Sequence, residues 1–373
     1  MQPALLLDTR AAAADPAPAT SRATSAIPSP VPPVSRAAPA APNAAPTIPS
    51  PMPSASRATP PAPNAVPGPD GFRAGHGEIH AHHGEIVQGM FYSSDGTVEH
   101  GLVTLPCTLF RTRVRFRPLR SGPLTVEPGD RTRARAAARL TLDALGRTGW
   151  GGAIRIESTV PVQWGCGSST TDVLATIRAV ADAFGTVLDP AWIAGLAVAA
   201  ETASDSLMYG PGRAVLFAQR RGRVLLDLGG PLPAVRVLGF NTEGEHGVAT
   251  LTLPPVPYSA WEIEAYRAVL GLLHRAVADQ DPGLLGRVAT ASTLIMQRHR
   301  PKRHMPELLR LAQEAGALGV QVAHSGTVAG FLFAPGAGAA DRIECARAGL
   351  SRLGVGDSWE FSTELASHPE AAA

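Results

Sequence analysis

Apolar residues recur with helical and strand periods only from about residue 71 onward. Residues 170–184 predict a helix, because Val173, Ile177 and Val180 share one face with Phe184. Further helices are expected at 132–147, 190–203, 259–280, 282–297, 306–317 and 339–353. Strands are expected at 97–106 and 108–118 (as a pair), 153–159, 214–219, 224–228, 235–240, 319–324, 328–334 and 358–362. Because helices and strands mix without a regular βαβα alternation, the pattern indicates an α+β protein in two lobes.

The first 70 residues have a different composition from the rest of the chain. They hold 18 of the 35 prolines, 19 alanines, one glycine and no aromatic residue. Residues 27–47 recur at 48–68 with 14 identical positions, and neither copy has an apolar face. Such a segment cannot bury enough apolar surface to offset its ordering, so we expect a disordered, polyproline-like tail. A docking ligand for a partner is the functional alternative to a repeat tolerated because it is unstructured.

These composition changes, and a proline-rich stretch at 253–258, divide the chain. We expect a disordered Pro/Ala-rich tail at 1–70, a first lobe at 71–252, a second lobe at 253–365 and a short disordered tail at 366–373.

Charge and composition exclude several classes of protein. The 33 basic and 31 acidic residues nearly balance and form no basic run, which argues against a nucleic-acid partner. Lys302 is the only lysine, so a Walker phosphate loop or a pyridoxal Schiff base is not expected. Cys107, Cys166 and Cys345 have no C-x-x-C spacing, as is usual in a reducing compartment. No apolar stretch approaches the roughly 18 residues of a membrane span, so we expect a cytoplasmic protein without a membrane partner.

The segment 161–172, PVQWGCGSSTTD, joins a predicted strand to a predicted helix. Unpaired N–H groups and the helix dipole suit a helix N-terminus to hold an anion, and glycines let the backbone approach phosphate oxygens closely. The hydroxyls can reach a magnesium ion. The alternative is an S-x-x-D cap made by Ser169 and Asp172.

This strand–P-x-x-x-G-x-G-S-S–helix pattern resembles the phosphate-binding motif of the GHMP small-molecule kinases. The form S-S-T-T-D-V-L-A-T-I resembles the L-threonine kinases of cobalamin side-chain assembly in particular. Two further segments resemble that branch, in the family's order: AHHGEIVQGMF at 81–91 and VAHSGTVAGFL at 322–332. The family's lysine near the first motif is absent here, so its contribution is either missing or made by another group.

The resemblance implies a two-lobed GHMP kinase fold, with an S5-like N-terminal lobe and a ferredoxin-like C-terminal lobe. It also implies an ATP- and Mg²⁺-dependent kinase that phosphorylates the hydroxyl of a small amino acid, with L-threonine as the first choice. The alternatives are another acceptor (homoserine, serine or a secondary-metabolite precursor) or a non-catalytic nucleotide and amino-acid sensor.

Site residues follow from the matched motifs. ATP would contact the loop through Pro161, Gly165, Cys166, Gly167, Ser168, Ser169 and Thr170. Ser168 and Glu201 would bind the metal. Glu201 and Asp205 are the candidate catalytic residues, because their i, i+4 spacing near a helix end places both carboxylates on one face. Asp205 would act on the acceptor hydroxyl, as a base or only as an orienting group. Glu85, Gln88 and Gly326 would line the acceptor site.

Three other patterns favour simpler interpretations. The histidine-dense stretch that includes His80, His82 and His83 lacks accompanying Cys or Asp residues, so a zinc site is not expected. A helix start at Glu85, with His82 and His83 in an exposed turn, is the alternative to an acceptor-site role for this motif. His324 beside Ser325 does not indicate a hydrolase, since neighbours on a strand point to opposite faces. Alternating arginines at 111, 113 and 115 predict a solvated strand face, with an acceptor-carboxylate role as the alternative.

Overall fold

The structure is a computed structural model that describes residues 73–244 and 254–364, so the expected tails at 1–70 and 366–373 lie outside it. The described strands are β1 (Gly75–Tyr92), β2 (Val98–Leu119), β3 (Leu124–Glu127), β4 (Gly151–Ser158), β5 (Val215–Ala218), β6 (Arg223–Asp227), β7 (Arg236–Asn241), β8 (Gly319–Val322), β9 (Val328–Phe333) and β10 (Ser358–Ser362). The described helices are α1 (Thr132–Ala144), α2 (Ser168–Ala183), α3 (Pro190–Glu201), the 3₁₀ turn η1 (Leu207–Tyr209), α4 (Ala260–Asp279), α5 (Pro282–Gln297), α6 (Met305–Glu314) and α7 (Ala339–Arg352). The expected α+β class is confirmed.

The described strands form one sheet around a long central hairpin. Eight follow the order β10-β7-β9-β8-β1-β2-β4-β3, and β5 attaches β6 to β2. All neighbours are antiparallel except β3 and β4. Between β1 and β8 the only register partners are Glu85 and Val322. The N-terminal and C-terminal parts of the sheet therefore meet at Glu85.

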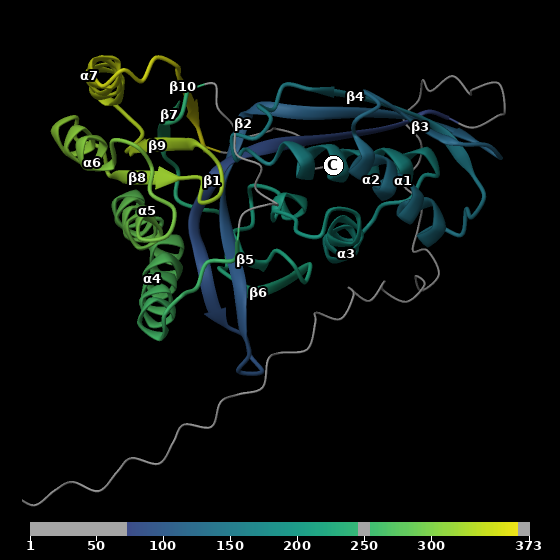
Figure 1. Cartoon of the computed structure of the whole chain (residues 1–373), viewed down its shortest axis with the longest axis horizontal. Helices are drawn as coiled ribbons and strands as arrows, with labels where there is room; N and C mark the ends of the chain where they lie inside the picture. The colour runs from purple at the N-terminus through teal and green to yellow at the C-terminus, as the bar shows by residue number, and fades with distance from the viewer. Residues whose placement is uncertain (1–72, 245–253, 365–373) are drawn as a thin grey trace, which may run out of the picture. The chain divides into compact units, whose positions relative to one another are not determined.

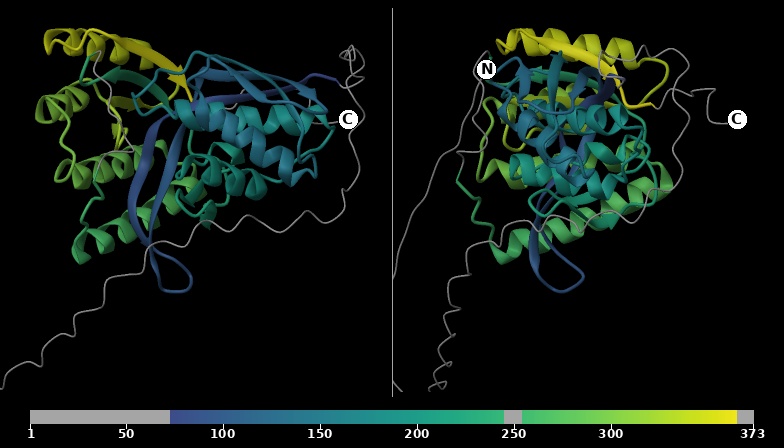
Figure 2. Two further views of the ribbon diagram at one scale, coloured as in Figure 1. Left: turned by 45° about the vertical axis from the view of Figure 1, so that its right-hand side comes forward. Right: turned by 90° about the vertical axis from the view of Figure 1, so that its right-hand side faces the viewer.

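Helices cover the sheet on either side of this hairpin. Figure 1 shows α1, α2 and α3 on one side of the β1–β2 ribbon and α4 to α7 on the other, and the left view of Figure 2 agrees. A large apolar core lies between α1–α3 and the N-terminal strands, with Phe116, Ile177 and Phe217 fully buried. Two further cores involve α4 with α5 and α6 with α7.

One small apolar cluster joins the two parts of the molecule. Ala81 of β1, Val160 and Cys166 of the β4–α2 loop, and Ala323 and Val328 beside the β8–β9 turn are all buried there. These residues belong to the three motifs singled out in the sequence or lie next to them. The cluster therefore holds the three motifs together at the centre of the sheet.

The central hairpin differs from its prediction. The pair of strands expected at 97–106 and 108–118 is one continuous strand, β2, and its partner is β1, which the pattern did not predict. Pro106, taken as a strand end, lies inside β2 opposite His82. Proline has no N–H to donate to the neighbouring strand, and the register of the two strands shifts on both sides of this pair.

Strand β7 belongs with the C-terminal strands. It pairs with β9 and β10, although it precedes the expected lobe boundary at residue 253. No helix in the described ranges is long and apolar enough to cross a membrane.

Candidate active site

The β4–α2 loop leads directly into the N-terminus of α2. Gly167 is the N-cap residue, with φ of 75°, and no side chain caps the helix. Asp172 instead accepts a hydrogen bond from the Thr112 hydroxyl at 3.2 Å and lies 3.2 Å from Nε of Arg131. The S-x-x-D capping alternative is therefore wrong, and the first turn of α2 keeps N–H groups that suit it to bind an anion.

The third motif packs against this loop through its backbone. The carbonyl of Trp164 accepts hydrogen bonds from N–H of Thr327 at 2.9 Å and of Val328 at 3.2 Å. Gly326 approaches the loop so closely that a Cβ there would lie 2.2 Å from the Trp164 carbonyl oxygen and 2.4 Å from Cα of Gly165. Only glycine fits this contact, so Gly326 fixes the position of the loop relative to the β8–β9 turn.

Glu201 lies under the loop at the C-terminal end of α3. Its carboxylate accepts hydrogen bonds from the hydroxyls of Ser169 at 2.9 Å and Thr170 at 3.0 Å, and Arg133 of α1 donates to the Ser169 oxygen. Burial, together with the nearby charge of Asp205, raises the pKa of Glu201 to about 8. The carbonyl of Ser168, the other expected metal ligand, accepts a hydrogen bond from the Thr171 hydroxyl at 2.9 Å.

Asp205 reaches the site by a different route from the predicted one. Helix α3 ends at Glu201, Thr202 turns the chain with φ of 73°, and Asp205 lies in the following loop. The argument from a shared helix face was therefore wrong. The two carboxylates nevertheless come close enough for the charge of Asp205 to raise the pKa of Glu201.

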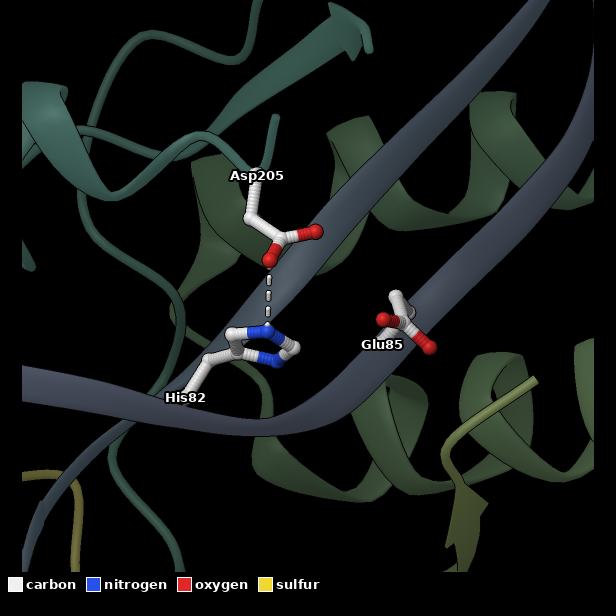
Figure 3. A group of neighbouring side chains, drawn as sticks. All are labelled: His82, Glu85 and Asp205. Atoms are coloured by element: carbon white, nitrogen blue, oxygen red, sulfur yellow. Dashed lines mark hydrogen bonds and ion pairs between the residues drawn. The ribbon is translucent and has the colours of Figure 1, made fainter. Parts of the chain in front are cut away.

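The partner of Asp205 is His82, so the alternative that placed His82 in an exposed turn is wrong. The His82 ring is only 2% exposed, its Nε2 lies 2.9 Å from Oδ2 of Asp205, and its Nδ1 lies 3.1 Å from the carbonyl of Gly84. Figure 3 shows the ring directed at the carboxylate, with Glu85 beside it on the same strand. The sequence offered one clue, since His82 falls within the first motif.

Opposite charges stabilise this pair. Burial alone would lower the pKa of His82, but the charge and hydrogen bond of Asp205 outweigh it and raise that pKa to about 9. Burial likewise works against the charged form of Asp205, and the His82 ring overcomes it and holds the pKa of Asp205 below its usual value. The pair is therefore an imidazolium and a carboxylate at neutral pH.

His82, Glu85 and Asp205 lie within 4.8 Å of one another through ligand-type atoms. An imidazolium has no lone pair for a metal ion, and its two N–H groups face Gly84 and Asp205. The geometry therefore favours an ion pair over a metal site.

A bulge in β1 turns His82 and Glu85 to the same side. Residues three apart on a regular strand point to opposite faces, but the register shift between these two residues inserts one extra residue. Gly84, within the bulge, has φ of 66°, which glycine adopts without strain.

Glu85 begins a chain of buried polar groups. Its carboxylate accepts the backbone N–H of His324 at 3.0 Å and lies 3.3 Å from Nδ1 of the same residue. On its other side, the His324 ring contacts the hydroxyl of Ser292 at 3.1 Å. Gln88 is also buried, and its Oε1 has no partner among the described residues. Glu85 and Gln88 therefore lie beside the same buried polar groups, since the backbone N–H of Gln88 donates to the Ser292 hydroxyl at 3.4 Å.

The other residues that the sequence singled out have structural partners. His324 bonds to Glu85 and Ser292, which supports no Ser/His pair with Ser325. Arg111 and Arg113 pair with Glu78 on an exposed face of the hairpin, as expected for a solvated strand. Cys166 is buried in the small apolar cluster and packs the loop.

Comparison with known proteins finds similarity to one family of kinases. Residues 132–212 match the model of the GHMP kinases N terminal domain. The L-threonine kinase of Salmonella typhimurium (strain LT2) is 28% identical over 190 residues, and that of Citrobacter freundii is 31% identical over 195 residues. These matches cover 49% and 48% of this chain, and the chain spans 61% of each relative.

Among solved structures, homoserine kinase from Cytophaga hutchinsonii superimposes with a TM-score of 0.58 at 18% sequence identity. The match covers 78% of this chain and 95% of that protein. The described residues thus have the two-lobed GHMP kinase fold, as the resemblance in sequence implied, and residues 132–212 match the model of its N-terminal domain.

Proposed function

We propose that this protein is an ATP-dependent GHMP-type phosphotransferase. It transfers the γ-phosphoryl group of ATP to the hydroxyl of a small hydroxy amino acid, and L-threonine, which gives O-phospho-L-threonine, is the first candidate. One observation carries the proposal. Ser169 and Thr170, in the first turn of α2, donate hydrogen bonds to the Glu201 carboxylate, beside the His82–Asp205 pair.

ATP would lie with its phosphates on the loop from Pro161 to Thr170. The N–H groups of the first turn of α2, together with its dipole, would face the anion. Gly165 and Gly167 let the loop pack closely, because a Cβ would lie 2.8 Å from Cα of Gly326 at the first position and 2.6 Å from the His82 ring at the second. The N-terminus of this helix supplies positive potential without a lysine in the motif.

The residues around Glu201 also fit a magnesium ion. A buried carboxylate whose pKa is raised to about 8 lacks a compensating cation, and carboxylate and hydroxyl oxygens are the ligands that Mg²⁺ prefers. Glu201 and Ser168 would hold it. When bound, Mg²⁺ neutralises charge on the phosphate oxygens.

Asp205 would face the acceptor hydroxyl. As the oxygen of the acceptor forms its bond to the γ-phosphorus, the bond from that phosphorus to ADP breaks, and the hydroxyl proton passes to Asp205 and then to water. Because His82 lowers the pKa of Asp205, the carboxylate is better suited to orient the hydroxyl than to retain its proton. His82 would hold Asp205 in place, with its ring anchored on Gly84.

The acceptor would bind beside Glu85 and Gln88. The Glu85 carboxylate complements an ammonium group, and the unpartnered Oε1 of Gln88 can accept one further hydrogen bond. Gly326 would close the site from the β8–β9 turn. This arrangement favours an amino acid over a neutral alcohol, whereas the choice among hydroxy amino acids depends on pocket shape.

The test is ADP release from ATP and Mg²⁺ with a panel of L-threonine, L-homoserine and L-serine, with ³¹P NMR to identify the product. We expect release with at least one of them and a phosphate monoester on its hydroxyl. Binding of ATP without release of ADP for any acceptor would contradict the proposal and favour a nucleotide sensor.

A further inference from the structure

The only lysine of the chain lies at the candidate active site. Lys302 follows α5, and its backbone N–H donates to the side-chain oxygen of Gln297 at 2.7 Å, which fixes the start of the α5–α6 loop. Its Nζ donates a hydrogen bond to the carbonyl of Gly326. The single lysine ammonium of this protein therefore reaches the turn that packs on the β4–α2 loop.

This ammonium has unused donor capacity. An ammonium group carries three N–H donors, and the Gly326 carbonyl is its only acceptor among the described residues. Burial lowers the pKa of Lys302 to about 8, although the negative charges of Glu85 and Glu243 oppose this shift. A desolvated cation with free donors is stabilised when an anion binds to it.

The position of Gly326 indicates which anion this is. Gly326 is in van der Waals contact with Gly165 of the loop, and its neighbour Thr327 donates to the Trp164 carbonyl. The ammonium of Lys302 thus contacts Gly326, and Gly326 in turn contacts the loop assigned to the phosphates. The acceptor cluster at Glu85 and Gln88 offers instead a carboxylate and an amide oxygen.

We propose that Lys302 contacts the γ-phosphoryl group of ATP during transfer, so that the C-terminal lobe supplies the lysine missing from the first motif. This rests on the proposed function. The ammonium would donate to the γ-phosphoryl oxygens, on which charge is spread in the transition state. The lysine, the loop and Glu201 would then act on the phosphoryl group from three different elements.

Because the chain has one lysine, an amine-specific reagent tests the contact directly. We would treat the full chain with N-hydroxysuccinimidyl acetate at pH 8 and follow acetylation of Lys302 by peptide mass spectrometry. With saturating MgAMP-PNP we expect labelling of Lys302 to slow at least about fivefold, and with MgADP to slow little. The N-terminal amine is the internal control, because its labelling should be the same in both samples.

Equal protection by both nucleotides would overturn the contact with the γ-phosphoryl group. Protection by L-threonine but by neither nucleotide would overturn it as well, and would assign Lys302 to the acceptor carboxylate. Nucleotide binding is measured separately by titration calorimetry. If neither nucleotide binds, the proposed function fails together with this assignment; if both bind without selective protection, only this assignment fails.

Variants give a second measurement. Lys302→Gln should lower kcat by about 100-fold or more and reduce the affinity for AMP-PNP to that for ADP, while Lys302→Arg retains part of both. Arg303→Gln is the matched control, because Arg303 is exposed in the same loop. A Lys302→Gln enzyme with unchanged kcat and unchanged preference for AMP-PNP would contradict the proposal.

Discussion

His82 and Asp205 show how one contact fixes the charge of both partners. The ring is 2% exposed, and an isolated imidazolium so deeply buried would lose its proton. The 2.9 Å contact with Asp205 reverses this and raises the pKa of His82 to about 9. The His82 ring therefore has a higher pKa, and holds its proton more tightly, in the folded protein than in the unfolded chain.

We therefore predict that the stabilising effect of His82 decreases as the pH rises. Its folded pKa of about 9 lies above the unfolded value of 6.5, so the contribution is complete below pH 6.5 and is lost by about pH 9. The loss should amount to roughly 2–4 kcal/mol of unfolding free energy. The measurement is urea unfolding of wild type and His82→Gln between pH 6 and pH 10.

The difference between the two proteins should shrink over this interval. His76→Gln is the control, because the His76 side chain is exposed on the same strand. A difference that stays constant from pH 6 to pH 10 would show that His82 is neutral in the folded protein.

Glu201 leads to a prediction about turnover. Glu201→Ala should reduce kcat with ATP by at least about 100-fold, because it removes the carboxylate assigned to the metal and the acceptor of two hydroxyl groups. Ser168→Ala should have a similar effect if its hydroxyl also binds the metal. Glu157→Gln is the control, since Glu157 is exposed on β4. Full activity of both site variants would refute the metal assignment.

At the scale of elements, the site depends on where regular structure stops. Helix α3 ends at Glu201, β1 is interrupted between His82 and Glu85, and α2 begins at Ser168 without a side-chain cap. Each irregularity directs a functional group to the same place. A continuous helix to Asp205 or a regular β1 would have carried these side chains elsewhere.

The contact between the β4–α2 loop and the β8–β9 turn can be tested with one methyl group. Gly326→Ala would place a Cβ 2.2 Å from the Trp164 carbonyl, so the backbone must shift. We expect a loss of about 1–3 kcal/mol in unfolding free energy and weaker nucleotide binding. Gly356→Ala, where a Cβ meets nothing within 4 Å, should change neither. Equal stability of the two variants would argue against this contact in solution.

Local signals predicted several elements well. Helix α5 and strand β10 match the expected ranges 282–297 and 358–362, and Asp281 caps α5 with proline at the start of the helix, as the sequence suggests. Strand β1 was missed, because its run of Gly, His and Glu has no alternation. It is a strand because β2 and β8 pair with it.

At the scale of the whole molecule, the N-terminal segment is predicted to be dispensable for catalysis. The repeated Pro/Ala composition of residues 27–68 provides no apolar face to pack on a folded domain. Deletion of residues 1–68 should leave kcat and the melting temperature nearly unchanged, as measured by the ADP-release assay and by calorimetry. A large drop in melting temperature would mean that this segment packs on the lobes.

By itself, the sequence determined the fold class, most helices and the three motifs, because periodicity, caps and glycine patterns are local properties of the chain. It also predicted Glu201, Asp205 and Glu85 as site residues by residue type and motif. Only the tertiary structure decided the partners of these groups. The His82–Asp205 contact spans 123 residues and the Lys302–Gly326 contact joins two loops, and no periodicity encodes either. Burial and pairing set the charges of the site, and both depend on side chains brought together from distant parts of the chain.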